Sequence, residues 1–492
     1  MSKAYRYQQL ESWLLEGITG QRWRVGERLP SVRDMCREQQ VSKATVLHAY
    51  QRLEARGLLE ARPKSGYFVL PDVANRGAPH IVSHAIVAPA PVTVSDVVMD
   101  VMDRGAAFDI LPELRGLELQ AGRDTLYSRS VDQNRKMTSP ANHAGITALN
   151  RSIGRALRSQ SDRAHQYYDE PAGDAGLREQ LAQRYRRHGC ESSADDFCIT
   201  AGCQQSLFLA LMACCQRGDI VAVESPGFYG VLQLLEQLGL QVVEIPASAV
   251  TGMDTEALER ALQQWSIRAC VVTPAFATPT GATLPSASRQ TLLALADQYD
   301  LALIEDDIYG DLGFFGRPDP LKAQDKSDRV ILCSSFSKSL SRDVRIGWIE
   351  AGRWHHQVKR LKLVTSLASS RFVQQGLASF IKDGGYDTHL RRQREQLRQQ
   401  RNELVEFLDK HWPKEICFSV PEGGLALWLQ LPQGINTLSA YGAALNKGVV
   451  ITPGALFSST DHYRNCLRLS FLHPLTASRQ EALKILMGVL SH

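Results

Sequence analysis

Two features are missing from this sequence: an apolar run long enough to cross a membrane, and any Cys-x-x-Cys pair. The longest obvious apolar run, Leu207 to Cys215, is far shorter than the roughly 20 residues of a membrane-spanning helix. The opening residues MSKAYRYQQLESW lack the apolar core of a signal peptide, and the ten cysteines have no regular spacing. His355 and His356 have no partners at metal-ligand spacing, so we expect them at the surface and predict no metal site. We therefore expect a cytoplasmic protein with reduced thiols and no membrane segment.

Positive charge is concentrated at the start of the chain. Residues 1–70 contain twelve Lys or Arg and seven Asp or Glu, a balance of +5, whereas all 492 residues together carry +4. A chain of this length exceeds what one hydrophobic core supports, so we expect at least two folding units. The local excess predicts a small module that binds a phosphate-rich partner, attached to a larger body without that property.

Residues 31–57 have the pattern of two helices joined by a tight turn. Ser31 and Asp34 form a capping signature for the first helix; Ser42 is a good N-cap for the second, which Gly57 would end. The apolar residues recur at helical spacing: Val32, Met35 and Cys36 in the first helix, then Val46, Ala49, Tyr50 and Leu53 in the second. The following LLEARPKSGYFVL alternates like a hairpin, which predicts a winged helix-turn-helix. The alternative is a solvated basic helical bundle.

The second helix of such a module enters the DNA major groove with its leading end. The motifs G-x-R-L-P-S-x-R, V-S-x-x-T-V-x-x-A-Y-x-x-L-x-x-x-G and S-G-Y-F-V resemble the winged helix-turn-helix of the GntR regulators. Helix position and this resemblance together place the DNA contacts at Arg33, Ser42, Lys43, Ala44, Thr45, Arg62, Lys64 and Gly66.

A Pro- and Ala-rich segment follows the basic module. We predict a DNA-binding domain at 1–71, a linker at 72–120 and a second domain at 121–492 with a small lobe at about 385–492. In the second domain apolar β-like runs alternate with amphipathic helices, which predicts an α/β fold with a mainly parallel sheet. The expected strands are Asp219–Glu224, Gln241–Ile245, Ala269–Thr273, Leu301–Asp306 and Val330–Ser334.

Polar residues at the ends of these strands suggest a ligand site, because ligands bind beyond the strand carboxyl ends of such sheets. Asp306 and Tyr309 follow one strand; Lys338 and Arg345 follow another; and Thr200–Leu207 places a glycine before a helix. Pyridoxal 5'-phosphate needs a lysine for an imine, a carboxylate for its ring nitrogen and an anion seat made of helix-terminal amides, hydroxyls and an arginine. The strand ends supply all three.

Residues of roughly 140–490 resemble the fold-type I, class I aminotransferases. The resemblance implies that Lys338 forms the internal aldimine, Asp306 partners the pyridine nitrogen and Tyr309 bonds the ring hydroxyl. It assigns Phe228 to stacking on the ring and Arg468 to the effector α-carboxylate. The implied phosphate ligands are Ser335, Ser337, Arg345, Gly202, Cys203 and Gln204, with Tyr168 reaching in from the other subunit of a homodimer.

The chain departs from that family at two places. Thr278, in FATPTGATL, replaces the usual asparagine at the ring hydroxyl, and SLSRDV adds Arg342 and Asp343 near the cofactor. Both changes argue against efficient transamination. Further on, leucines seven residues apart in YDTHLRRQREQLRQQRNELVEFL predict an amphipathic helix with a solvated basic face.

The whole arrangement resembles the MocR subgroup of GntR regulators. That resemblance implies a homodimeric transcriptional regulator that binds double-stranded operator half-sites and responds to pyridoxal 5'-phosphate or an amino compound. The alternative is an active aminotransferase with an accessory N-terminal module. A third hypothesis is that the cofactor only stabilises the fold.

Overall fold

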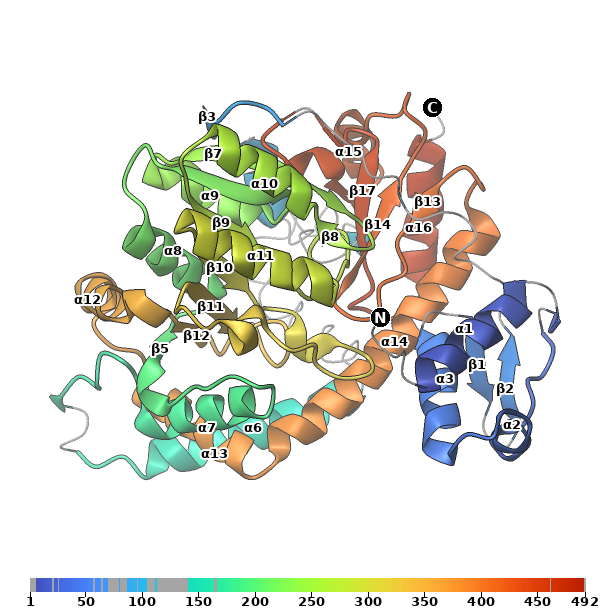
Figure 1. Ribbon diagram of the computed structural model, residues 1–492, viewed down its shortest axis with the longest axis horizontal. Helices are drawn as coiled ribbons and strands as arrows, with labels where there is room; N and C mark the ends of the chain where they lie inside the picture. The colour runs from blue at the N-terminus through green and yellow to red at the C-terminus, as the bar shows by residue number, and fades with distance from the viewer. Residues whose placement is uncertain are drawn as a thin grey trace, which may run out of the picture.

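The structure is a computed structural model, drawn in Figure 1. It describes residues 6–19, 22–24, 26–55, 58–62, 65–69, 79, 86–94, 96–103, 111–112, 140–162, 166–460 and 462–490. Three predictions fall outside these residues: Lys64, Gly57 as the end of the second helix, and most of the proposed linker with the start of the second domain.

The N-terminal module is a winged helix-turn-helix, as predicted. Ser31 Oγ accepts the Asp34 N–H at 3.2 Å, and Ser42 Oγ accepts the Thr45 N–H at 3.1 Å, so both predicted N-caps are formed. The four predicted apolar residues of the second helix are fully buried, whereas in the first helix only Met35 is, because Val32 and Cys36 lie at the rim of this small core. Its elements are α1 (Arg6–Thr19), α2 (Val32–Gln39), α3 (Lys43–Ala55), β1 (Leu59–Arg62) and β2 (Gly66–Val69).

A mainly parallel sheet forms the centre of the large domain. Its strand order is β3-β7-β6-β9-β10-β11-β12-β5, with β8 beside β7, and all five predicted runs are strands. The β7-β6-β9-β10-β11 neighbours are parallel, whereas β12 is antiparallel to both its neighbours. The strands are β3 (Ala90–Pro91), β5 (Phe197–Thr200), β6 (Ile220–Ser225), β7 (Gln241–Ser248), β8 (Gly252–Met253), β9 (Ile267–Val272), β10 (Ala302–Asp306), β11 (Val330–Ser335) and β12 (Gly347–Glu350).

Helices cover both faces of this sheet (Figure 1). On β10, Ala302 and Ile304 belong to the core beneath α8 and α9, whereas Leu303 belongs to the core beneath α10 and α11. Because both faces are buried, these strands are apolar throughout rather than alternating. The helices of the domain are α4 (Asp96–Asp103), α6 (Pro140–Arg158), α7 (Ala175–Arg186), α8 (Cys203–Cys214), α9 (Tyr229–Leu238), α10 (Thr255–Gln264), α11 (Ser286–Tyr299), α12 (His355–Ser366) and α13 (Arg371–Lys382).

The helix α14 (Gly385–His411) leads into the C-terminal lobe (Figure 1). The predicted leucine stripe is buried, but the predicted solvated basic face is only partly correct. Arg391 and Arg392 are exposed, whereas Arg401 is fully buried and donates to the Pro421 carbonyl at 2.8 Å, because neighbouring elements flank α14 on several sides. The lobe contains β13 (Cys417–Phe418), β14 (Ala426–Gln430), β16 (Thr452–Pro453), β17 (Cys466–Ser470), α15 (Thr437–Asn446) and α16 (Ala477–Leu490), while β15 (Val449–Val450) pairs with β4 (Leu111–Pro112).

Within the described ranges no helix is both long and apolar enough to cross a membrane. The same part of the chain contains no group of His, Cys, Asp and Glu side chains that could hold a metal ion. His356 is exposed as predicted, but His355 is half-buried, because it opens α12 against the domain.

Below the carboxyl end of β10 lies a buried charge network made of Asp307, Asp311, Arg184 and Arg317. Asp311 Oδ1 accepts from Arg184 at 3.2 Å and from Arg317 at 3.1 Å, and Tyr386 donates its hydroxyl to Oδ2 at 2.8 Å. Burial alone would raise the pKa of Asp311, but the two guanidinium groups outweigh burial and lower it. The network therefore depends on the ionised carboxylate.

We expect Asp311→Asn to lower the free energy of unfolding by about 1–3 kcal/mol, because it removes the carboxylate shared by two buried guanidinium groups and leaves Arg317 with Asp307 and Arg184 with Asp387. Chemical denaturation measures this loss. Since the pKa is lowered from 3.8, the wild-type contribution is complete above that pH and disappears as the pH falls below it. Asp297→Asn is the control, because the Asp297 side chain is 59% exposed beside Arg329. Equal losses in the two variants would contradict the role of the network.

Candidate functional site

The candidate site lies where the parallel strands β10 and β11 end. Asp306, the last residue of β10, is in register with Cys333 of β11, and two residues later β11 ends at Ser335. Because parallel strands share one carboxyl edge, Asp306 and the loop that carries Lys338 emerge side by side. The structure thus brings together the two residues on which the sequence-based prediction rests.

Lys338 sits in the loop between β11 and β12, which α14 braces. The Gln393 side chain donates to the Lys338 carbonyl at 3.3 Å, and the Ser339 hydroxyl lies 2.7 Å from that of Tyr386. Burial lowers the pKa of the Lys338 amine well below its usual value, and the nearby guanidinium groups of Arg342 and Arg468 act in the same direction. A lowered pKa favours the neutral amine, which is the nucleophilic form.

Asp306 is almost fully buried, within electrostatic reach of the Lys338 amine. Its Oδ1 accepts the Cys203 thiol, with 3.2 Å between sulfur and oxygen. Burial raises the pKa of Asp306 to about 6, although the Cys203 hydrogen bond and the Lys338 amine oppose the rise. A buried carboxylate of this kind is well placed to bind a protonated ring nitrogen.

Cys203 and Gln204 were predicted as phosphate ligands, yet their side chains have other partners. The Cys203 thiol is bonded to Asp306, and the Gln204 amide donates to the Gly230 carbonyl at 2.9 Å. Their main-chain N–H groups, in the first turn of α8, still face the helix start. The sequence contained no signal for the thiol–carboxylate contact, because the two residues are 103 positions apart.

An anion seat is formed where α8 begins. Gly202 precedes the helix with φ +117°, and Arg345, with φ +51°, donates to the Ala201 carbonyl at 2.7 Å. Glycine suits this position because L side chains rarely adopt such a φ, and a Cβ atom there would also lie 2.8 Å from the Arg345 guanidinium. At the end of β11, Ser335 Oγ accepts the Ser337 N–H at 3.3 Å. Helix N–H groups, hydroxyls and an arginine suit a phosphate group.

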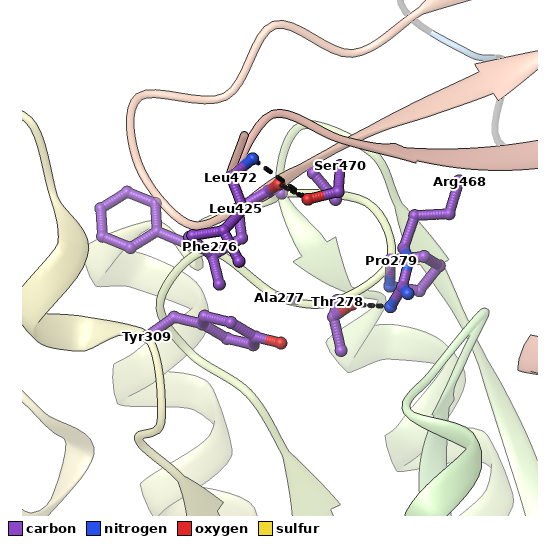
Figure 2. Close-up of a pocket in the computed structure, with 11 residues that line it drawn as sticks. Phe276, Ala277, Thr278, Pro279, Tyr309, Leu425, Arg468, Ser470 and Leu472 are labelled. Atoms are coloured by element: carbon purple, nitrogen blue, oxygen red, sulfur yellow. Dashed lines mark hydrogen bonds between the residues drawn. The ribbon is translucent and has the colours of Figure 1, made fainter. Parts of the chain in front are cut away.

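Arg468 reaches the site from the C-terminal lobe. It lies on β17, donates to Thr278 Oγ1 at 3.4 Å and sits 5.2 Å from the Phe457 ring. Figure 2 shows Arg468, Thr278 and Tyr309 around a pocket, with the Tyr309 hydroxyl directed toward Thr278. Burial raises the pKa of Tyr309 to about 12, so the phenol remains protonated and able to donate. The predicted aromatic Phe228 caps α9 and is partly buried.

Tyr168 stands apart from these residues, at the surface. Its side chain is 80% exposed on the segment that follows α6. The neighbouring Tyr167 is also exposed, and its carbonyl accepts from Arg371 at the start of α13 at 3.4 Å.

Apart from Lys64, which lies outside the described residues, the predicted DNA-contacting residues are exposed or partly exposed on the winged helix. Arg62 is paired with Glu60 at 2.7 Å and stacks on Phe68, while Gly66 has φ +103° close to the Arg28 side chain. Arg28 was not predicted, although it is the arginine of the G-x-R-L-P-S motif. Five of the predicted residues are exposed or partly exposed at the start of α3 and on α2: Ser42, Lys43, Ala44, Thr45 and Arg33.

Comparisons with known proteins agree with this two-part architecture. Residues 6–69 match the family "Bacterial regulatory proteins, gntR family", and residues 139–485 match "Aminotransferase class I and II". The chain is 36% identical over 480 residues to YjiR of Escherichia coli strain K12, an uncharacterized HTH-type transcriptional regulator, covering 97% of each protein.

Solved aminotransferases share the fold of the large domain. Kynurenine aminotransferase of Pyrococcus horikoshii is 30% identical with a TM-score of 0.66, covering 70% of this chain and 87% of that one. LysN, the alpha-aminoadipate aminotransferase of Thermus thermophilus, was solved with N-(5'-phosphopyridoxyl)-L-leucine; it is 27% identical with a TM-score of 0.65, covering 70% of this chain and 88% of that one.

Removal of the buried charge at Asp306 should stabilise the protein when it is free of small molecules. The pKa of Asp306 is about 6 in the fold and 3.8 in a free side chain, so above pH 6 the buried ion costs about 3 kcal/mol. Asp306→Asn should be more stable by about that amount at pH 8, and the difference should shrink as the pH falls from 6 toward 4. Denaturant titrations at several pH values measure it, with the exposed Glu415→Gln as control. A pH-independent difference would refute the assignment.

Proposed function

We propose, since the chain belongs to the MocR subgroup of GntR-family transcriptional regulators, that it binds pyridoxal 5'-phosphate on Lys338 and responds to the cofactor or an amino compound. The observation that carries this proposal is the convergence of Lys338 and Asp306 at one sheet edge beside the anion seat at Gly202. The chain is a transcriptional regulator with an aminotransferase-like domain.

The residues of the site fit pyridoxal 5'-phosphate. When bound, this group supplies an electrophilic aldehyde and an electron-withdrawing ring. The Lys338 amine would hold the aldehyde carbon, and the Asp306 carboxylate would keep a proton on the ring nitrogen. Tyr309 and Thr278 would bind the ring hydroxyl. The phosphate would be held by Ser335, Ser337, Arg345 and the α8 amides of Gly202, Cys203 and Gln204, with Phe228 stacked on the ring.

An amino-compound effector would be recognised across the two lobes. Arg468 belongs to the C-terminal lobe, whereas Lys338 belongs to the large domain. The planar guanidinium of Arg468 suits a carboxylate. An effector that bridges the two residues would favour one lobe arrangement over another, and this differential affinity would drive a switch.

A second copy of the chain would complete the site. Tyr168 would reach the phosphate of the other subunit, which accounts for its 80% exposure in a single chain. Exposed apolar side chains accompany it on α6, on α12 and in the residue after α12: Leu157, Leu363, Val364 and Leu367. Homodimerisation would bury them and present two winged helices to paired DNA half-sites.

The alternative function is an active aminotransferase with an accessory N-terminal module. Lys338 and Arg468 permit this chemistry, whereas Thr278 in place of asparagine argues against efficient turnover. We propose 1–71 as the DNA-binding domain, 121–492 as the cofactor-binding domain, and 72–120 as the segment that joins them, within which β3 and α4 pack on the cofactor-binding domain.

Addition of pyridoxal 5'-phosphate should produce the visible absorbance band of its covalent adduct with Lys338. Lys338→Ala should abolish the band, because no other amine lies beside Asp306 among the predicted site residues. Lys326→Ala, at an exposed position, should retain it. An undiminished band in Lys338→Ala would overturn the assignment of the lysine.

The protein should bind a duplex from the intergenic region upstream of its own gene, with an affinity that falls steeply with salt and changes on cofactor addition. Lys43→Ala should weaken binding and reduce the salt slope by about 1, if Lys43 contacts a phosphate. Gel-shift titrations at several salt concentrations measure both effects, with exposed Arg391→Ala as control. Absent DNA binding together with rapid turnover of amino acid and keto acid would favour the aminotransferase. An affinity indifferent to the cofactor would favour a purely stabilising role.

A further inference from the structure

An ion pair joins the winged helix to the large domain, between Arg398 of α14 and Glu54 of α3. Their Nη1 and Oε1 atoms are 2.9 Å apart, and the side chains are only 18% and 10% exposed. Figure 1 shows the N-terminal module beside α14. Ion pairs that are largely withdrawn from water are screened less by salt than exposed pairs. This contact therefore identifies where the winged helix-turn-helix module, here called the head, meets the large domain.

Glu54 ties the contact to the whole winged helix. Near the end of α3, its Oε1 also accepts the Ala61 N–H of β1 at 3.1 Å, so one carboxylate oxygen holds the recognition helix, the hairpin and Arg398. The opposite end of α3, with Ser42 and Lys43, remains exposed. The head can therefore present the start of α3 to DNA while the end of α3 stays paired with Arg398.

The same helix α14 also holds the loop of Lys338. Gln393, five residues before Arg398, donates to the Lys338 carbonyl at 3.3 Å. One turn earlier, a His389 ring nitrogen lies 3.1 Å from the Ser339 carbonyl. A helix rises about 1.5 Å per residue, so only about 7.5 Å of helix separates the residue that contacts the lysine loop from the residue that contacts the head. Arg394, between them, donates to the Asp311 carbonyl at 2.7 Å and so links α14 to the charge network beside the site.

We propose that α14 couples the lysine loop to the DNA-binding head, with Gln393 as the contact to the loop and the Arg398–Glu54 pair as the contact to the head. The coupling rests on the proposed function, because it presumes that Lys338 binds the cofactor. A shift of the Lys338 main chain displaces Gln393 and α14, and the Arg398–Glu54 pair transmits that displacement to the winged helix. The head has two arrangements, docked and released, and the cofactor biases them through their different contacts.

The test compares Arg398→Ala with two matched variants on the same helix. Arg398→Lys keeps the positive charge, and Arg392→Ala removes an exposed arginine six residues, or about 240° of helix rotation, before Arg398. For each protein, the affinity for the upstream duplex is measured with and without pyridoxal 5'-phosphate, and small-angle scattering gives the radius of gyration. The cofactor absorbance band shows whether Lys338 still binds.

Arg398→Ala should increase the radius of gyration and reduce the cofactor-dependent change in DNA affinity by about fivefold or more, while the absorbance band stays intact. Arg398→Lys should restore docking in part, and Arg392→Ala should behave as wild type. Gln393→Leu should reduce the affinity change without increasing the radius of gyration, because the head contact remains.

The outcomes separate the two proposals. If wild-type DNA affinity ignores the cofactor, the sensing part of the proposed function fails and the coupling with it, while the scattering of Arg398→Ala still decides whether the pair docks the head. If the wild type responds and Arg398→Ala responds equally, coupling through α14 is overturned. An unchanged radius of gyration in Arg398→Ala overturns the docking role.

Discussion

The parallel register of β10 and β11 is the constraint on which the candidate site depends. It pairs Leu303 with Val330 and Asp306 with Cys333, so the carboxylate and the loop of Lys338 leave the sheet at the same edge. An antiparallel pairing would send the two chain ends in opposite directions. The neighbouring elements are oriented by the same sheet: β5 leads into Gly202 and α8, and β6 leads into Phe228 and α9. One pairing pattern thereby collects residues that are far apart in the sequence.

Burial in this site disfavours the ionised forms of two of its residues. Burial raises the pKa of Asp306 and lowers that of Lys338, so each group is kept away from its preferred ionised form in water. Binding sites commonly contain such costly groups, and the cost is offset elsewhere in the fold. Here the network of Asp307, Asp311, Arg184 and Arg317 supplies paired charges that begin at the residue after Asp306. Tyr386 joins it to Ser339, next to Lys338.

The helix α14 contacts both the lysine loop and the winged helix. Its buried face packs in the body, its Gln393 contacts the lysine loop, and its Arg398 contacts the winged helix. A regulator needs a physical connection between the group that senses a ligand and the group that binds DNA. In the proposed coupling that connection is the continuous helix α14.

The sequence by itself determined the winged helix, the parallel sheet and the positions of Lys338, Asp306 and Arg345, because local signals carry them: caps, apolar periodicity and polar residues at strand ends. Tertiary structure alone decided which side chains meet. The Cys203 thiol on Asp306, the burial of Arg401 in a helix whose pattern predicts a solvated face, and the Arg398–Glu54 pair join residues far apart in the chain. Periodicity reports which face of an element is apolar, but it cannot report what that face, or the opposite one, will pack against.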